Sequence, residues 1–144
     1  MPFISYAQNY EDVMLWRALQ EVKHGFYVDV GAADPEEWSV TRAFYDRGWS
    51  GINVEPLDEY FDKLSHARPR DTNLKVAVAR EAGVRTLHTI AGSGLSTFNP
   101  RIAARHKTAG WETCDDKVKA GRICCVRIAA NEGDVKHTIF RNRK

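Results

Sequence analysis

Residues 25–34 read Gly25-Phe26-Tyr27-Val28-Asp29-Val30-Gly31-Ala32-Ala33-Asp34, and they give the clearest indication of the fold class. Residues 26–30 are apolar or aromatic except for Asp29. The small residues Gly31, Ala32 and Ala33 follow, and Asp34 is the second acid. The pattern is typical of a buried parallel strand that ends in a turn at the carboxyl edge of a sheet. Because Gly31 lacks a Cβ atom, the turn lets a ligand approach the backbone closely.

A second predicted strand, Gly51-Ile52-Asn53-Val54-Glu55, also ends in an acid. Pro56 favours extended backbone at Glu55, which helps to hold that carboxylate at the end of the strand. Two neighbouring parallel strands, one ending in a glycine turn and the next in a carboxylate, form the nucleoside crevice of open α/β sheets. There the carboxylate accepts hydrogen bonds from ribose hydroxyls. We therefore predict that the chain binds an adenosine-containing cofactor.

The turn lacks the Gly-x-Gly-x-x-Gly pattern with which dinucleotide folds hold a pyrophosphate at a helix N-terminus. Only Gly31 is present, and two acids, Asp29 and Asp34, flank it. Carboxylates repel a pyrophosphate, but they suit a cofactor whose charged end is an amine or a sulfonium, such as S-adenosylmethionine. The alternative is that both acids only shape the turn and cap a helix, since Asp34-Pro35-Glu36-Glu37 resembles a capping box.

Length and composition bound the class of protein. The 144 residues are enough for one domain with one core. No stretch approaches the roughly 20 apolar residues of a membrane span, and the N-terminus lacks the pattern of a secretory signal. Cys114, Cys124 and Cys125 do not have the spacing of a redox motif or a zinc site. We therefore expect a cytoplasmic protein with reduced thiols, no membrane span and no metal site.

Charge is distributed unevenly along the chain. Residues 1–100 contain 10 Lys and Arg against 14 Asp and Glu, whereas residues 101–144 contain 11 against five. A basic end is found in chains that bind nucleic acid or anionic surfaces. Here it has no interleaved aromatic residues and no recognisable helix face. We therefore expect a solvated, poorly ordered end and no nucleic-acid partner.

Apolar spacing and capping residues predict the order of the elements. Helices are expected to begin with caps at Asn9, at Asp34 or Ser39, and at Asp58. Strands are expected over residues 26–30, 51–54, 74–79 and 84–90, with a weaker helical signal over 99–107 and one further strand over 122–129. This alternation predicts an α/β fold with a doubly wound, mostly parallel sheet. Complete cofactor domains have more strands, so we expect the sheet to be incomplete at the C-terminus.

Five blocks carry a family resemblance. They are Ser5-Tyr6-Ala7-Gln8-Asn9-Tyr10-Glu11-Asp12-Val13, Phe26-Tyr27-Val28-Asp29-Val30-Gly31-Ala32, Ser39-Val40-Thr41, Arg47-Gly48-Trp49-Ser50-Gly51-Ile52-Asn53-Val54-Glu55-Pro56 and Gly94-Leu95-Ser96-Thr97. In order and spacing they resemble the FkbM-type methyltransferase family. The resemblance covers residues 5–98 and implies the Rossmann-like fold of class I methyltransferases, as a single domain over residues 1–144 in which 99–144 have diverged.

The resemblance implies a function and a site. It implies a methyltransferase that uses S-adenosylmethionine and methylates a hydroxyl of a sugar or a secondary metabolite. Asp29, Gly31 and Ala32 match the family's first cofactor motif, and Glu55 matches its ribose-binding acid. We place Asp34 in the same cofactor site because it follows the turn. The implied partner is a small-molecule or glycan hydroxyl acceptor.

The later part of the family pattern is changed. Its Lys-Ile-Asp-x-Glu-Gly strand is matched only by residues 127–133, with Ala129 in place of the Asp. The alternative function is therefore a truncated, catalytically silent remnant that binds a nucleoside or a partner protein. A third reading is a fragment whose exposed sheet edge makes it aggregate.

Methyl transfer to a sugar hydroxyl requires a base, because the hydroxyl pKa is far from neutral. The histidines are scattered, at positions His24, His66, His88, His106 and His137. Asp34 and Ser96 lie nearer to the expected mouth, but a cap and a loop are the commoner roles for such residues. The sequence leaves the catalytic residues, the acceptor and the oligomeric state unassigned.

Overall fold

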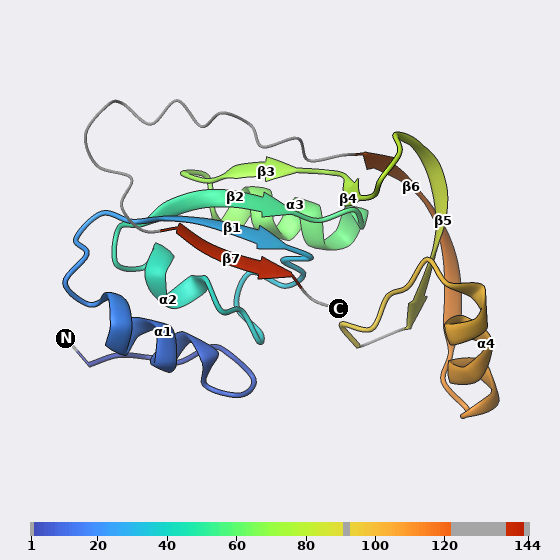
Figure 1. Cartoon of the computed structure of the whole chain (residues 1–144), viewed down its shortest axis with the longest axis horizontal. Coiled ribbons are helices and arrows are strands. Elements are labelled where there is room, and N and C mark those ends of the chain that lie inside the picture. Colours follow the sequence, from blue (N-terminus) through green and yellow to red (C-terminus); the bar gives the residue numbers. More distant parts are fainter. Residues whose placement is uncertain (1, 91–92, 122–137, 143–144) are drawn as a thin grey trace.

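Two β-sheets organise the chain in the computed structural model, which describes residues 2–90, 93–121 and 138–142 (Figure 1). The elements, in chain order, are α1 (Glu11–Leu19), β1 (Phe26–Val30), α2 (Arg42–Tyr45), β2 (Ser50–Val54), α3 (Asp58–Ala67), β3 (Thr72–Leu74), β4 (Ala77–Val78), β5 (Gly83–Ile90), α4 (Pro100–Thr108), β6 (Thr113–Gly121) and β7 (Thr138–Asn142).

The first sheet has the strand order β3-β2-β1-β7, and every neighbouring pair is parallel. Asp29 of β1 lies beside Asn53 of β2, and Val30 lies beside Val54. The carboxyl ends of all four strands therefore meet at one edge of the sheet. The predicted strands over 26–30 and 51–54 and the α/β character of the fold are confirmed.

The second sheet has the order β4-β6-β5, in which β4 and β6 are parallel and β5 and β6 are antiparallel. In Figure 1 the arrowheads of β1, β2 and β7 point toward β5 and β6, so this sheet stands opposite the carboxyl edge of the first one. The predicted strand over 84–90 is confirmed as β5, but its only strand partner among the described residues is the antiparallel β6.

The single strand predicted over 74–79 is wrong. The chain forms two short strands there, and they belong to different sheets, β3 to the first and β4 to the second. Between them the N–H of Val76 donates to the carbonyl of Leu74 at 3.0 Å, which closes a tight turn around Lys75. This turn carries the chain from one sheet to the other.

The helices between the parallel strands lie on one face of the first sheet, as in one half of a doubly wound sheet, and the complete arrangement stays a prediction. The chain steps from β1 through α2 to β2, and from β2 through α3 to β3, in the same direction across the sheet. Right-handed crossovers in one direction place both helices on one face. In agreement, Arg68, which follows α3, donates to the Thr41 hydroxyl, which precedes α2, at 2.6 Å.

The core has two centres. Tyr27, Phe44, Tyr45 and Trp49 form the first, and the apolar residues of α1 and of the segment after it pack against them. The second lies in the other sheet and consists of Ala77, Leu87, Val118 and Ala120, with Leu57 and Phe98 at its border. Because Leu57 directly precedes α3, the second core joins the two sheets next to the carboxyl edge.

The beginnings of the helices differ from the predicted caps. Tyr10, not Asn9, directly precedes α1, and the Asn9 amide donates instead to Glu11 at 3.3 Å. Asp12 is fully buried and accepts hydrogen bonds from the backbone of Tyr6 at 2.7 Å and of Ala7 at 3.2 Å. The α1 start is therefore fixed by Asp12, which ties the N-terminal segment to the helix.

The helix caps predicted at Asp34 or Ser39 and at Asp58 are also wrong. The Asp34 carboxylate accepts from the N–H groups of Glu36 and Glu37, at 2.9 and 3.0 Å, but closes a turn and not a helix. Ser39 accepts a hydrogen bond from Arg68, and α2 begins only at Arg42.

Asp58 is the first residue of α3, after Leu57, and forms an ion pair with Lys75 at 2.8 Å. Ser39 and Asp58 thus bond to side chains of other segments, whereas Asp34 bonds to the backbone of its own turn.

Among the later elements, one was predicted and one was not. The weak helical signal is confirmed as α4, where the Asn99 side chain accepts from the N–H of Arg101 at 2.9 Å and Pro100 is the first helical residue. Strand β6 was not predicted. The strand expected over 122–129 and the motif over 127–133 lie outside the described residues.

No helix in the described ranges is long and apolar enough to span a bilayer.

Candidate functional site

The turn after β1 folds back over the end of β2. The N–H groups of Gly31 and Ala32 both donate to the carbonyl of Val54, at 2.8 and 3.2 Å. Gly31 has a φ of 73° and Ala33 a φ of 54°, so both residues adopt the left-handed region that favours glycine. The backbone of the turn thereby comes into contact with the residue that follows β2, which is Glu55.

Glu55 is 4% exposed and bonds to both neighbouring segments. Its Oε2 accepts from the N–H of Ala33 at 2.9 Å, and its Oε1 accepts from the N–H of Leu57 at 3.0 Å. The Glu55 N–H donates to Leu74 of the next strand at 3.0 Å. The carboxylate is therefore fixed at the carboxyl edge, and carboxylate oxygens can accept more than one hydrogen bond.

A cavity of about 290 Å³, here cavity A, opens between this edge and the second sheet. Gly31, Ala33 and Glu55 line it from the first sheet. Apolar side chains form much of its remaining wall, namely Leu57, Val76, Ala77, Val78, Leu87 and Phe98. Its volume lies close to the lower end of the ~300–1,000 Å³ range of small-molecule pockets.

Asp29, in β1, and Ala32, within the turn, line none of the cavities at this edge of the sheet. Asp29 is fully buried, and its Oδ2 accepts from the Thr41 hydroxyl at 2.9 Å. Thr41 in turn accepts from Arg68, which is also fully buried and donates to the Pro35 carbonyl at 2.5 Å. This buried network holds the segments on both sides of the turn.

Asp34 lines a smaller cavity of about 110 Å³, cavity C, together with Glu37, Trp38 and Lys63. The Lys63 ammonium lies 3.4 Å from the Asp34 carboxylate. Partial burial opposes ionisation of Asp34, but the backbone N–H groups of Glu36 and Glu37 and then Lys63 bring its pKa below the ordinary value. Cavity C is thus lined by two carboxylates, those of Asp34 and Glu37, and by the ammonium of Lys63.

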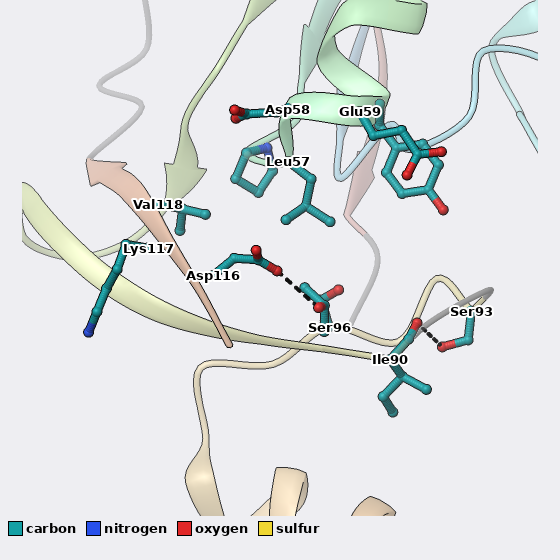
Figure 2. A pocket seen from close by; sticks show the side chains of 12 residues that line it. Leu57, Asp58, Glu59, Ile90, Ser93, Ser96, Asp116, Lys117 and Val118 are labelled. Carbon is teal, nitrogen blue, oxygen red and sulfur yellow. Dashed lines mark hydrogen bonds between the residues drawn. The ribbon is translucent and has the colours of Figure 1, made fainter. Parts of the chain in front are cut away.

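The third cavity, cavity B, has a volume of about 370 Å³ and lies between the start of α3 and strands β5 and β6 (Figure 2). Leu57, Ser96 and Tyr60 line both cavity A and cavity B, and Tyr60 and Ser93 line all three cavities. Burial, and then the Glu59 carboxylate, raises the pKa of Tyr60. Its hydroxyl therefore stays protonated and can donate a hydrogen bond where the cavities meet.

The histidines lie elsewhere. None of the four in the described ranges lines these cavities, and His137 lies outside those ranges. His88 pairs with Asp115 at 2.6 Å. Within the described residues, no group of three or more His, Cys, Asp or Glu side chains is arranged to hold a metal ion.

Tyr60 and Asp116 line these cavities but were not predicted as site residues. Asp116 lies in β6, where Lys117-Val118-Lys119-Ala120 alternates polar and apolar residues, a short signal of a strand with one buried face. The structure brings Gly31, Glu55 and Ser96 together at cavity A and places Asp34 at the neighbouring cavity C.

Comparison with protein families agrees with this geometry. A family model described as Methyltransferase FkbM domain matches residues 29–139, and so reaches from the end of β1 into β7. This range contains Asp29, Gly31 and Glu55 and extends beyond residues 5–98, over which the blocks of resemblance were found. No curated protein and no solved structure matches the chain. Because the matched range spans well over half of its length, the chain belongs to the FkbM methyltransferase domain family.

Proposed function

We propose that this protein is an S-adenosylmethionine-dependent methyltransferase that acts on a hydroxyl of a sugar or a secondary metabolite. The observation that carries the proposal is Glu55, a buried carboxylate held by two backbone N–H groups at the end of the second parallel strand. It lines cavity A beside the glycine turn. A carboxylate in this position suits the two hydroxyls of a ribose.

The residues around Glu55 fit the rest of such a cofactor. The apolar wall of cavity A, with Leu57 and Phe98, suits an adenine ring. In cavity C, Asp34 suits the amine of the methionine end and Lys63 its carboxylate. Asp29 and Ala32 act from beneath by holding the turn, and Gly31 gives the cofactor access to the backbone. The proposal thus assigns three of the five predicted residues, Gly31, Asp34 and Glu55, to cavity walls and gives Asp29 and Ala32 a supporting role.

The cofactor, when bound, supplies an electrophilic methyl group on a sulfonium. The protein supplies the groups that hold the cofactor in position. Hydrogen bonds from Ala33 and Leu57 fix Glu55, and the Thr41 and Arg68 network fixes the turn. Holding two reacting groups in line contributes several kcal/mol to a displacement of this kind.

Calorimetric titration of the wild-type protein with S-adenosylmethionine and S-adenosylhomocysteine tests the cofactor half of the proposal. NAD⁺ is the control ligand, and we expect no binding, because Asp34 would repel its pyrophosphate. Transfer of a labelled methyl group to a panel of hydroxyl compounds tests the other half. Binding without any transfer would favour the alternative, a catalytically silent remnant, in its nucleoside-binding form. Lack of binding would refute the methyltransferase proposal and leave only a remnant that binds a partner protein.

A further inference from the structure

Cavity B has walls suited to an acceptor. It borders cavity A through Leu57, Tyr60 and Ser96, so a molecule in cavity B would lie next to one in cavity A. Hydroxyl groups of Thr89, Ser93 and Ser96 and the carboxylates of Asp58, Glu59 and Asp116 line it. The wall is thus rich in groups that accept hydrogen bonds from hydroxyls.

The three carboxylates differ in their partners. Asp58 pairs with Lys75 at 2.8 Å and Glu59 pairs with Lys63 at 2.9 Å. The Oδ2 of Asp116 accepts from the neutral Thr89 hydroxyl at 3.0 Å, and no described residue donates to its Oδ1. Figure 2 shows Asp116 directed into the cavity. Asp116 is therefore the carboxylate in cavity B that is oriented by a hydrogen bond without being paired with a cation.

Lys117 also lines cavity B, but it does not neutralise the charge of Asp116. The ammonium of Lys117 donates to Thr86 at 2.5 Å, and in Figure 2 it points away from Asp116. The adjacent Asp115 points to the other face of β6, since neighbouring strand residues alternate, and it pairs there with His88. The negative charge facing cavity B at position 116 is thus uncompensated.

We propose that cavity B is the acceptor pocket and that Asp116 binds the acceptor hydroxyl and takes up its proton. This inference rests on the proposed function. Methylation breaks the O–H bond of the acceptor and forms an O–C bond, while the pair of the broken S–C bond stays on sulfur. The released proton goes to Asp116 and then to water. The uncompensated charge selects neutral or cationic hydroxyl compounds and rejects anionic ones such as sugar phosphates.

Nuclear magnetic resonance titration tests the pocket without turnover. The protein saturated with S-adenosylhomocysteine is titrated with neutral probes, namely myo-inositol and the methyl glycosides of glucose, galactose and mannose, and with the 6-phosphates of these sugars. At least one neutral probe should shift the amide resonances of Thr89, Asp116 and Val118 but not that of Asp115, and the phosphates should bind at least about tenfold more weakly. No shift with any neutral probe, or equal binding of the phosphates, would overturn the assignment.

Two matched variants test the role of Asp116. With the probe that binds best, Asp116→Asn should lower kcat about 100-fold or more. It should leave the affinity for S-adenosylhomocysteine unchanged, and Asp115→Asn should leave both unchanged. An Asp116→Asn protein with near wild-type kcat, or an equal loss in Asp115→Asn, would remove the role of Asp116. A wild-type protein that fails to bind S-adenosylhomocysteine would refute the proposed function itself.

Discussion

The backbone N–H of Ala33 donates to Oε2 of Glu55 across 2.9 Å, which joins the turn after β1 to the end of β2. One carboxylate thus shapes the turn and faces cavity A. Its position relative to the backbone is set by the fold before any ligand arrives. A site organised in this way loses little conformational entropy on binding.

Replacing this carboxylate should weaken cofactor binding. Glu55→Ala should cost about 1.5–3 kcal/mol of binding free energy for S-adenosylhomocysteine, because it removes charge-assisted hydrogen bonds. Calorimetry measures the change. Glu81→Ala is the control, since Glu81 is exposed and lines none of the three cavities. An unchanged affinity in a folded Glu55→Ala protein would show that Glu55 does not bind the ribose of the cofactor.

The turn should not tolerate a branched side chain. Gly31 has a φ of 73°, so Gly31→Val strains the backbone and adds atoms to the wall of cavity A. We expect cofactor binding to be lost while far-ultraviolet circular dichroism is retained. Gly110→Val is the matched control, since Gly110 has a φ of 88° and no atom within 4 Å of its added Cβ. If both variants bind S-adenosylhomocysteine equally well, the turn is not part of the cofactor site.

The buried arginine should be important for stability. Arg68 donates to Thr41, Ser39 and the carbonyl of Pro35, and it is fully buried. Arg68→Met leaves these groups without a donor, so we expect a loss of about 3–5 kcal/mol in the free energy of unfolding. Urea denaturation measures it. The exposed Arg17→Met should change stability by less than about 0.5 kcal/mol. Equal effects of the two substitutions would contradict the role of the network.

Tyr27 makes stability depend on alkaline pH. Burial raises its pKa above 10.0, and the neighbouring Asp71 carboxylate, which accepts its hydroxyl proton in a hydrogen bond, raises it further. The unfolded state therefore loses this proton near pH 10 while the folded state keeps it. The resulting stabilisation is complete below pH 10 and falls by up to about 1.4 kcal/mol per pH unit above it.

Tyr27→Phe removes this group without removing the ring. The free energy of unfolding of the variant should fall less steeply above pH 10 than that of the wild type. Urea denaturation at a series of pH values from neutral upward gives both curves. Parallel curves would show that Tyr27 does not keep its proton in the folded state.

Strand β6 should be protected from amide exchange. It pairs with β5 from Thr113 to Ala120 and with β4 at its end. This pairing contradicts, for these residues, the expectation of a solvated, poorly ordered end over residues 101–144. Hydrogen-exchange mass spectrometry should therefore show slower exchange over residues 113–120 than in the exposed turn before it. Exchange at the rate of an unfolded peptide would show that the second sheet does not form.

The sequence predicted those parts of the fold that depend on neighbours along the chain. The strands over 26–30 and 51–54 were evident because each is a short apolar run that ends in an acid, and the parallel pairing follows from the helix between them. The place of Glu55 followed from the same two strands. These features require only local periodicity and the geometry of one crossover.

The features that sequence missed depend on partners far along the chain. The split between β3 and β4 is set by strand partners on two different sheets, and the pairing of β5 with β6 spans the whole of α4. The three predicted caps were wrong because Asn9, Ser39 and Asp58 bond to other side chains in the folded protein. Asp116 could not be assigned while its strand was unknown.

The segment from β4 to β6 begins and ends at the same place. Val78 lies beside Gly121, and the N–H of Ala79 donates to the carbonyl of Gly121 at 2.8 Å. From β4 the chain therefore builds one wall of cavity B and returns along β6 to lie beside β4 again. Segments whose ends meet can be exchanged with little disturbance to their host. A homologous segment grafted at the same junction would therefore change the wall of cavity B and the part of the cavity A wall that contains Phe98, and it would leave Gly31 and Glu55 in place.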